Sequence, residues 1–128
     1  MQLSIHGTYE EMSAKAAEAV IRLAEEFTSP LVCIPSGNTP VLFCKHLVDH
    51  FLQTGSKPNW FFVGLDEWIG VGRDVKGSCR HFVDEHFFKP LQIPEEQICF
   101  FDGKAADISA EQMKTENLLT LLCFLTIY

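Results

Sequence analysis

A polar loop, Ser36-Gly37-Asn38-Thr39, separates an apolar run from Pro40. Gly37 allows the backbone to turn tightly, and Ser36 and Thr39 carry hydroxyl groups. If a helix begins at Pro40 with Thr39 as its N-cap, the free N–H groups and positive dipole end of that helix face the loop. A phosphate monoester needs such donors, although an ordinary strand-to-helix turn uses the same residue types. Ser36, Gly37, Asn38 and Thr39 therefore form a candidate phosphate-binding loop.

A pair of carboxylates, Asp66-Glu67, directly follows a second apolar run, Trp60 to Leu65. A carboxylate at the end of such a run can be partly withdrawn from water, which suits a general base that moves protons. A pair that caps a surface loop or a helix would have the same sequence. On this pattern alone, catalysis and capping both stay open for Asp66 and Glu67.

Apolar runs and helical patterns elsewhere in the chain have to position these two clusters. Continuous apolar runs predict buried strands at residues 31–34, 60–65 and 98–101. Capping residues and helical periodicity predict helices at residues 8–27, 40–55, 78–88 and from 109 onward. Pro90 is expected to end the third helix. The apolar stripe of the first helix comprises Met12, Ala16, Val20, Leu23 and Phe27.

The alternation of helices and strands favours an α/β fold, a three-layer Rossmann-like parallel sheet with helices on both faces. Ligands of such sheets bind beyond the carboxyl ends of the strands. The phosphate-loop candidate follows the strand predicted at 31–34, and the carboxylate pair follows the strand predicted at 60–65. We therefore expect both clusters on the same edge of the sheet, where a ligand would bind.

Composition narrows the classes of function. The chain has 128 residues, enough for one domain with a buried core, and a formal net charge of −7. This charge argues against nucleic-acid binding, which depends on clustered Lys and Arg, so the many phenylalanines are expected in the core. The amino terminus lacks the pattern of a secretory signal, and the five cysteines show no C-x-x-C spacing. These features favour a reduced, cytoplasmic protein.

Two histidine pairs could suggest a metal site. His46 and His50 lie four residues apart, a spacing that can bind metal on a helix, but the sequence offers no third ligand nearby. His81 and His86 lie five residues apart, which does not match a helical metalloprotease motif. We expect neither a metal nor a cofactor.

Four motifs in chain order carry a resemblance to a known family: PSGNTP, LDEWIGV, GSCRHFVDEHFFKPL and FFDG. Together they resemble the glucosamine-6-phosphate deaminase/isomerase family, within the wider group that includes 6-phosphogluconolactonase. The resemblance implies that Ser36, Gly37, Asn38 and Thr39 hold the sugar phosphate. It implies that Asp66 moves a proton between C2 and C1 of the opened sugar, with Glu67 as the acidic neighbour in the catalytic motif. The implied products are a ketose 6-phosphate and ammonia.

Two positions bear on which member of this group the chain is like. Lactonases carry an arginine after the Asp-Glu pair, whereas this chain has Trp68, which fits the deaminases better. Trp68 in place of the more usual tyrosine, together with Cys79, is compatible with a branch that uses galactosamine 6-phosphate. The choice between glucosamine and galactosamine 6-phosphate stays open.

The resemblance covers residues 1–116 and matches only the N-terminal half of the family, followed by an apolar tail at 117–128. The second half of family members supplies the groups that open the sugar ring, so we expect a truncated chain that is inactive or weakly active. The alternatives are a non-catalytic phosphosugar-binding remnant or subunit, and a 6-phosphogluconolactonase-like hydrolase. Because the tail is apolar but too short to span a bilayer, we expect a homo-oligomer that buries it. The expected ligand is a small sugar phosphate, with no nucleic acid and no membrane as partner.

Overall fold

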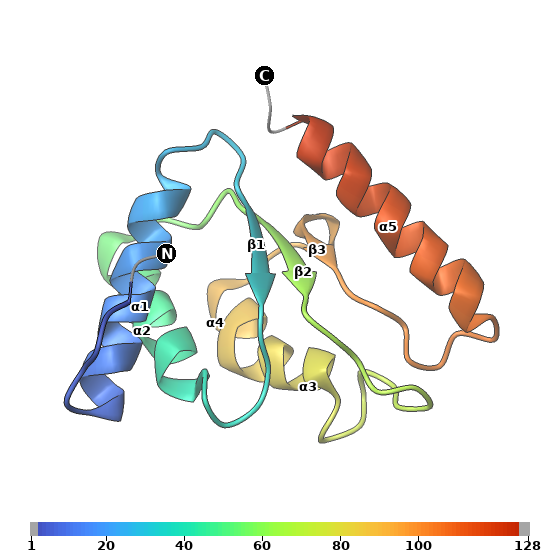
Figure 1. Cartoon of the computed structure of the whole chain (residues 1–128), viewed down its shortest axis with the longest axis horizontal. Helices are drawn as coiled ribbons and strands as arrows, with labels where there is room; N and C mark the ends of the chain where they lie inside the picture. Colours follow the sequence, from blue (N-terminus) through green and yellow to red (C-terminus); the bar gives the residue numbers. More distant parts are fainter. Residues whose placement is uncertain (1–2, 126–128) are drawn as a thin grey trace.

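The computed structural model describes residues 3–125 and has an α/β fold in which a small parallel sheet lies among helices (Figure 1). In this view α1 and α2 lie on one side of the strands and α5 lies on the other. The α/β class and the parallel sheet predicted from the sequence are confirmed. The elements in chain order are α1 Tyr9–Ala24, β1 Leu31–Ile34, α2 Val41–Thr54, β2 Phe61–Gly64, α3 Cys79–Val83, η1 Asp84–Phe88, α4 Lys89–Leu91, η2 Glu95–Gln97, β3 Ile98–Cys99 and α5 Ile108–Leu125.

The sheet has the strand order β1-β2-β3, and both strand pairs are parallel. Leu31 pairs with Phe61 and Ile34 with Gly64, so β1 and β2 end at the same level. The sequence predicted that the third strand would extend to residue 101, but β3 ends at Cys99. The ring of Phe100 explains this difference, because it lies where a side chain on Gly64 would stand, 2.4 Å from that Cβ position. The backbone therefore stops pairing with β2 after Cys99, and the Phe100 ring packs against β2 instead.

An aromatic cluster forms the centre of the core, as expected for the phenylalanines. Phe62 and Phe87 are fully buried, and Phe88 is almost so. The ring of Phe62 meets those of Phe87 and Phe88 edge-on at 5.3 and 5.4 Å between centroids. Burying each such ring stabilises the fold by roughly 1.5–3 kcal/mol. This core fixes the helix that follows β2 against the sheet.

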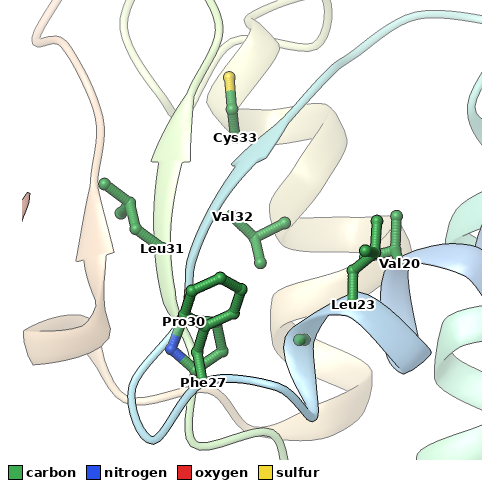
Figure 2. A pocket seen from close by; sticks show the side chains of 8 residues that line it. Val20, Leu23, Phe27, Pro30, Leu31, Val32 and Cys33 are labelled. Carbon is green, nitrogen blue, oxygen red and sulfur yellow. The ribbon is translucent and has the colours of Figure 1, made fainter. Parts of the chain in front are cut away.

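The apolar stripe predicted for α1 is wrong in its details. The buried residues of this helix are Ser13, Ala17 and Ala24, and they face the closely packed α2. Small side chains let two helices approach each other, so the larger apolar side chains lie elsewhere. Leu23 and Phe27 are 53% and 52% exposed. They line an open apolar groove of about 390 Å³ beside the edge strand β1 (Figure 2).

The third predicted helix is continuous but changes its hydrogen-bonding pattern. After α3, the five residues of η1 form a π-helical turn, and the N–H of Lys89 donates to the carbonyl of Asp84. Pro90 does not end the helix, contrary to expectation, since α4 runs to Leu91 and ends at Gln92 with a φ of 52°. A π turn is wider than an α turn, which leaves room for the proline ring beside the preceding carbonyls.

The last helix, α5, begins two residues earlier than a cap at Ser109 would predict. Its cap is Asp107, whose Oδ1 accepts from the N–H of Ala110 at 3.0 Å. α5 continues across residue 116, the boundary predicted for the family-like part. Residues 126–128 and the side chains of the segment 121–125 lie outside the described part, so the expected burial of the tail is not tested. Within residues 3–125, no helix is long and apolar enough to cross a membrane.

Candidate functional site

The loop Ser36–Thr39 joins the carboxyl end of β1 to α2, as the sequence predicted. Gly37 has a φ of 98°, a conformation that other residues rarely adopt, so this position requires glycine. The N–H groups of Gly37, Asn38 and Thr39 have no hydrogen-bond partner among residues 3–125. These groups are therefore available to an anion.

The predicted cap of α2 is wrong. α2 begins at Val41 with Pro40 in the N-cap position, and no side chain of the loop caps it. The hydroxyl of Tyr9, the first residue of α1, takes this place and accepts from the N–H of Leu42 at 3.2 Å. The same hydroxyl lies 2.8 Å from the carbonyl oxygen of Thr39 and 3.1 Å from that of Asn38. Tyr9 was not identified from the sequence. This residue lies 33 positions before Leu42, and no local sequence pattern indicates a contact over that separation.

Asp66 follows β2 by two residues and lies beside the loop. The N–H of Leu65 donates to the carbonyl of Ile34 at 3.3 Å, which keeps the ends of β1 and β2 together. A pocket of about 610 Å³ has Ser36, Gly37 and Asp66 in its wall, so the structure brings the two predicted clusters together. Asp66 is exposed, however, and the expectation that it is withdrawn from water is wrong for this structure. Asn38, Thr39 and Glu67 do not line the pocket.

The carboxylate of Glu67 turns away from the pocket and caps α3. Its Oε2 accepts from the hydroxyl of Ser78 at 2.6 Å and from the N–H of Arg80 at 3.0 Å. Its Oε1 accepts from the N–H groups of Cys79 at 3.0 Å and Trp68 at 2.8 Å. Burial raises the pKa of Glu67, but these hydrogen bonds outweigh it and hold the pKa below its usual value. Capping, one of the two roles left open by the sequence, is therefore the role that this geometry shows for Glu67.

The opposite wall of the pocket comes from the start of α3 and from η1. It includes Cys79, His81 and His86. None of these three residues was predicted from the sequence to belong to the site. Cys79 is buried, and its side chain interacts with those of Ser36 and Asp66. Burial raises the pKa of the Cys79 thiol above its usual value.

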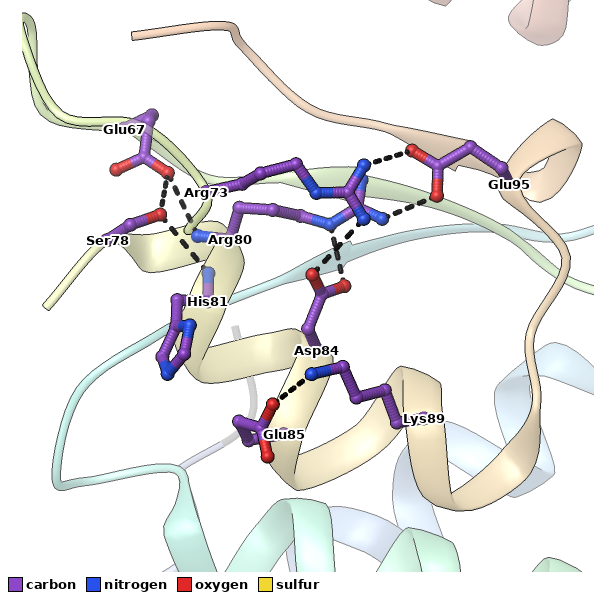
Figure 3. A network of polar contacts seen from close by, with 9 residues as sticks. All are labelled: Glu67, Arg73, Ser78, Arg80, His81, Asp84, Glu85, Lys89 and Glu95. Atoms are coloured by element: carbon purple, nitrogen blue, oxygen red, sulfur yellow. Dashed lines mark hydrogen bonds and ion pairs between the residues drawn. The ribbon is translucent and has the colours of Figure 1, made fainter. Parts of the chain in front are cut away.

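A buried arginine, Arg80, anchors α3 through a network of ion pairs (Figure 3). Arg80 is 5% exposed and pairs with Asp84 and Glu95, both at 2.7 Å. Arg73 reaches the same two carboxylates from the surface, at 3.3 and 3.0 Å. The guanidinium of Arg80 also lies 5.4 Å from the ring centre of Phe88. This network fixes the segment that follows Glu67 to the rest of the domain.

The residues considered as metal ligands have other contacts. His46 reaches across to Glu10 of α1 at 2.9 Å, and the ring of His50 meets that of Phe51 edge-on. Within the described ranges, no group of three His, Cys, Asp or Glu residues could hold a metal ion. The wall of the pocket carries hydroxyl, thiol, carboxylate and imidazole side chains and the ammonium group of Lys76.

Comparison with known proteins adds an independent finding. No protein-family model matches the chain. The glucosamine-6-phosphate deaminase of Geobacillus sp. (strain WCH70) is 34% identical over 123 residues, which are 95% of this chain and 49% of that protein. A solved monomeric glucosamine-6-phosphate deaminase superposes with a TM-score of 0.89 at 25% identity, over 95% of this chain and 51% of the other.

A more distant solved structure shares the fold. The 6-phosphogluconolactonase of Thermotoga maritima has a TM-score of 0.73 at 21% identity, over 94% of this chain and 53% of the other. The chain spans about half the length of the curated relatives it matches.

Proposed function

Because this chain is a homologue of the glucosamine-6-phosphate deaminases over about half of their length, we propose that it binds a hexosamine 6-phosphate. The loop Ser36–Thr39 would hold the phosphate, and Asp66 would face the sugar carbons. The observation that carries the proposal is the single pocket of about 610 Å³ that has Ser36, Gly37 and Asp66 in its wall. A phosphate donor set and a carboxylate that can accept a proton are the two parts such a site needs.

The phosphate role rests on backbone groups and not on basic side chains. Gly37 opens the turn, the N–H groups of residues 37–39 have no partner among the described residues, and α2 begins directly after the loop. The positive end of a helix dipole attracts a dianion there even in a protein with a net charge of −7. Ser36 adds a hydroxyl that can donate to a phosphate oxygen.

The proton-transfer role is assigned to Asp66 alone. With an opened amino sugar in the pocket, its carboxylate would take the proton from C2, the C–H electron pair would form a C1–C2 double bond, and the π pair of the C1 carbonyl would move to O1, which takes a proton from water. Return of the first proton to C1, with the nitrogen lone pair forming the C2–N double bond, leaves an iminium at C2, and its hydrolysis releases ammonia. The exposure of Asp66 leaves its carboxylate free to approach a ligand. Glu67 is proposed as the residue that holds the start of α3 in place, because two of its four hydrogen bonds come from Cys79 and Arg80 in α3 and a third from the N-cap residue Ser78.

Binding and turnover are separable in this proposal. The chain corresponds to about half of the deaminases, and ring opening has no assigned residue in the pocket, so we propose binding with little or no turnover. The lactonase alternative is not favoured, since solved 6-phosphogluconolactonases with this fold are less than a quarter identical to the chain and share only the fold with it.

A titration of the ¹⁵N-labelled chain tests the binding step. Glucosamine 6-phosphate and inorganic phosphate should both shift the amide signals of Gly37, Asn38 and Thr39 in a saturable way, whereas glucosamine should not. The absence of saturable shifts with either phosphate would refute the proposal. Ammonia release from glucosamine 6-phosphate, compared between the parent chain and Asp66→Asn, tests turnover separately.

We also propose that two copies of the chain associate and bury the apolar segment 117–128. Residues 118–128 contain no charged side chain, and the groove beside β1 leaves further apolar side chains in contact with water. Sedimentation equilibrium should then give the mass of a dimer at micromolar concentration. A monomer would contradict this association without affecting the binding proposal.

A further inference from the structure

The amino terminus of α2 depends on a side chain from another helix. The first N–H groups of any helix lack partners within that helix and usually receive them from the N-cap residue. Pro40 occupies that position in α2 and makes no side-chain cap. The hydroxyl of Tyr9 accepts from the N–H of Leu42 instead, at 3.2 Å. Tyr9 thus does for α2 what Thr8 does for α1, where the Thr8 hydroxyl accepts from the N–H of Glu11 at 3.1 Å.

The same hydroxyl holds the backbone of the loop in one orientation. The carbonyl oxygens of Thr39 and Asn38 lie 2.8 and 3.1 Å from Tyr9 Oη. The described backbone has no cis peptide bond, so the N–H of Thr39 lies in one plane with the Asn38 carbonyl and points in the opposite direction. The Thr39 carbonyl precedes Pro40, which has no N–H. With the carbonyl of Asn38 turned toward Tyr9, the N–H of Thr39 faces away from Tyr9. The orientation of a donor in the candidate phosphate loop therefore follows from the position of one phenol.

Tyr9 lies at the start of a helix that packs against α2. It is the first residue of α1, whose buried residues include Ser13 and Ala17. Glu10, the next residue, reaches His46 of α2 at 2.9 Å. The phenol oxygen therefore has a fixed distance from the loop, as a positioning group requires.

We propose that Tyr9 is a positioning residue of the phosphate loop, which presets the N–H group of Thr39 for an anion. This inference rests on the proposed function of the loop. It assigns to α1 a part in ligand binding that its sequence pattern, an amphipathic helix, does not indicate.

Thr54, at the other end of α2, provides a matched control. Its hydroxyl lies 3.0 Å from the carbonyl oxygen of His50 and 3.2 Å from that of Phe51, so it also links one hydroxyl to a terminus of the same helix. Tyr9→Phe and Thr54→Val each remove one hydroxyl without changing the shape of the side chain. Losing a neutral hydrogen bond changes the folding equilibrium constant by about three- to ten-fold, so the two variants should be destabilised to a similar extent.

The two variants should differ at the loop. Without ligand, hydrogen exchange of the Leu42 amide should become about three- to ten-fold faster in Tyr9→Phe and stay unchanged in Thr54→Val. In an NMR titration with inorganic phosphate and with glucosamine 6-phosphate, Tyr9→Phe should bind each about three- to ten-fold more weakly, and Thr54→Val should bind like the parent.

The outcomes separate the inference from the proposed function. Equal Leu42 exchange in both variants, or a phosphate affinity of Tyr9→Phe within two-fold of a parent that binds, would overturn the role of Tyr9. A parent chain that binds no phosphate would refute the function of the loop and, with it, the ligand-directed part of this inference. Faster exchange in Tyr9→Phe would in that case leave only a capping role for Tyr9.

Discussion

The amino ends of α2 and α3 are closed in different ways. At α3, the carboxylate of Glu67 accepts from the N–H groups of Cys79 and Arg80, and the Ser78 hydroxyl accepts from that of His81. The negatively charged carboxylate of Glu67 therefore already satisfies the free N–H groups at this helix end. At α2, the neutral hydroxyl of Tyr9 accepts from Leu42, and no carboxylate of the described chain is bonded there.

This difference indicates where an anion can bind. A phosphate at the start of α3 would have to displace Glu67 and would be repelled by it, whereas the start of α2 keeps its positive dipole end uncompensated. The two adjacent acids are also used differently, because Glu67 caps α3, whereas Asp66 is exposed and no capping hydrogen bond of its carboxylate is found among residues 3–125. Two adjacent carboxylates therefore have different tasks, decided by which helix end each one can reach.

The largest expected effect comes from removing the anchor of α3. Arg80→Met leaves Asp84, which is 6% exposed, without its nearest partner. Breaking a buried ion pair on one side costs about 3–5 kcal/mol, and urea denaturation should show a loss of this size. Arg73→Met is the control, because Arg73 contacts the same two carboxylates from an exposed position. It should cost less than about 1 kcal/mol, and equal losses in both variants would contradict the distinction.

Removing the cap of α3 should have the next largest effect. Glu67→Ala leaves the N–H groups of Cys79 and Arg80 without their acceptor and should cost about 1–3 kcal/mol. The pKa of Glu67 is lowered in the folded state, so its contribution is complete above the unfolded pKa near 4.5 and is lost as the pH falls through the folded pKa. Urea midpoints should therefore converge between the parent and Glu67→Gln as the pH falls below 4.5. A constant difference down to pH 3 would show that the charge of Glu67 is not what stabilises α3.

Much of this arrangement could be predicted from local sequence. Leu31–Ile34 and Phe61–Gly64 are short apolar runs next to polar residues, and parallel pairing places their ends together. That logic was enough to bring Ser36, Gly37 and Asp66 to one pocket. It works because each cluster directly follows its strand in the chain.

The parts that could not be predicted depend on residues distant in sequence. Tyr9 reaches Leu42 across 33 positions, and Glu67 reaches Arg80 across 13, so no local pattern distinguishes the capping carboxylate from the free one. The exposure of Asp66 likewise depends on what packs around it and not on the apolar strand before it. The early end of β3 follows from the packing of Phe100 against Gly64, a contact between different strands.

A smaller effect is expected from the glycine in the phosphate loop. Gly37→Ala places a side chain at a φ of 98° and should cost about 1–3 kcal/mol, toward the lower end because no atom lies within 4 Å of the new Cβ. Gly55→Ala is the control, since Gly55 has a φ of 67° at the other end of α2 and equal space around it. Both variants should lose similar stability in thermal unfolding, but only Gly37→Ala should weaken phosphate binding in the NMR titration. Equal binding by the two would place the phosphate outside this loop.

The smallest effect on stability is expected where the effect on chemistry should be greatest. Asp66→Asn changes an exposed carboxylate for which no capping hydrogen bond is found among residues 3–125, so the free energy of unfolding should change by less than about 0.5 kcal/mol. Glu67→Gln, the same change one residue later, should cost more because its carboxylate accepts four hydrogen bonds, two of them from the start of α3. Both variants should still bind inorganic phosphate, since neither residue belongs to the loop. If Asp66→Asn destabilised the fold as much as Glu67→Gln, Asp66 would be a second structural carboxylate. The contrast between a capped helix end and a free one would then no longer assign the chemistry to Asp66.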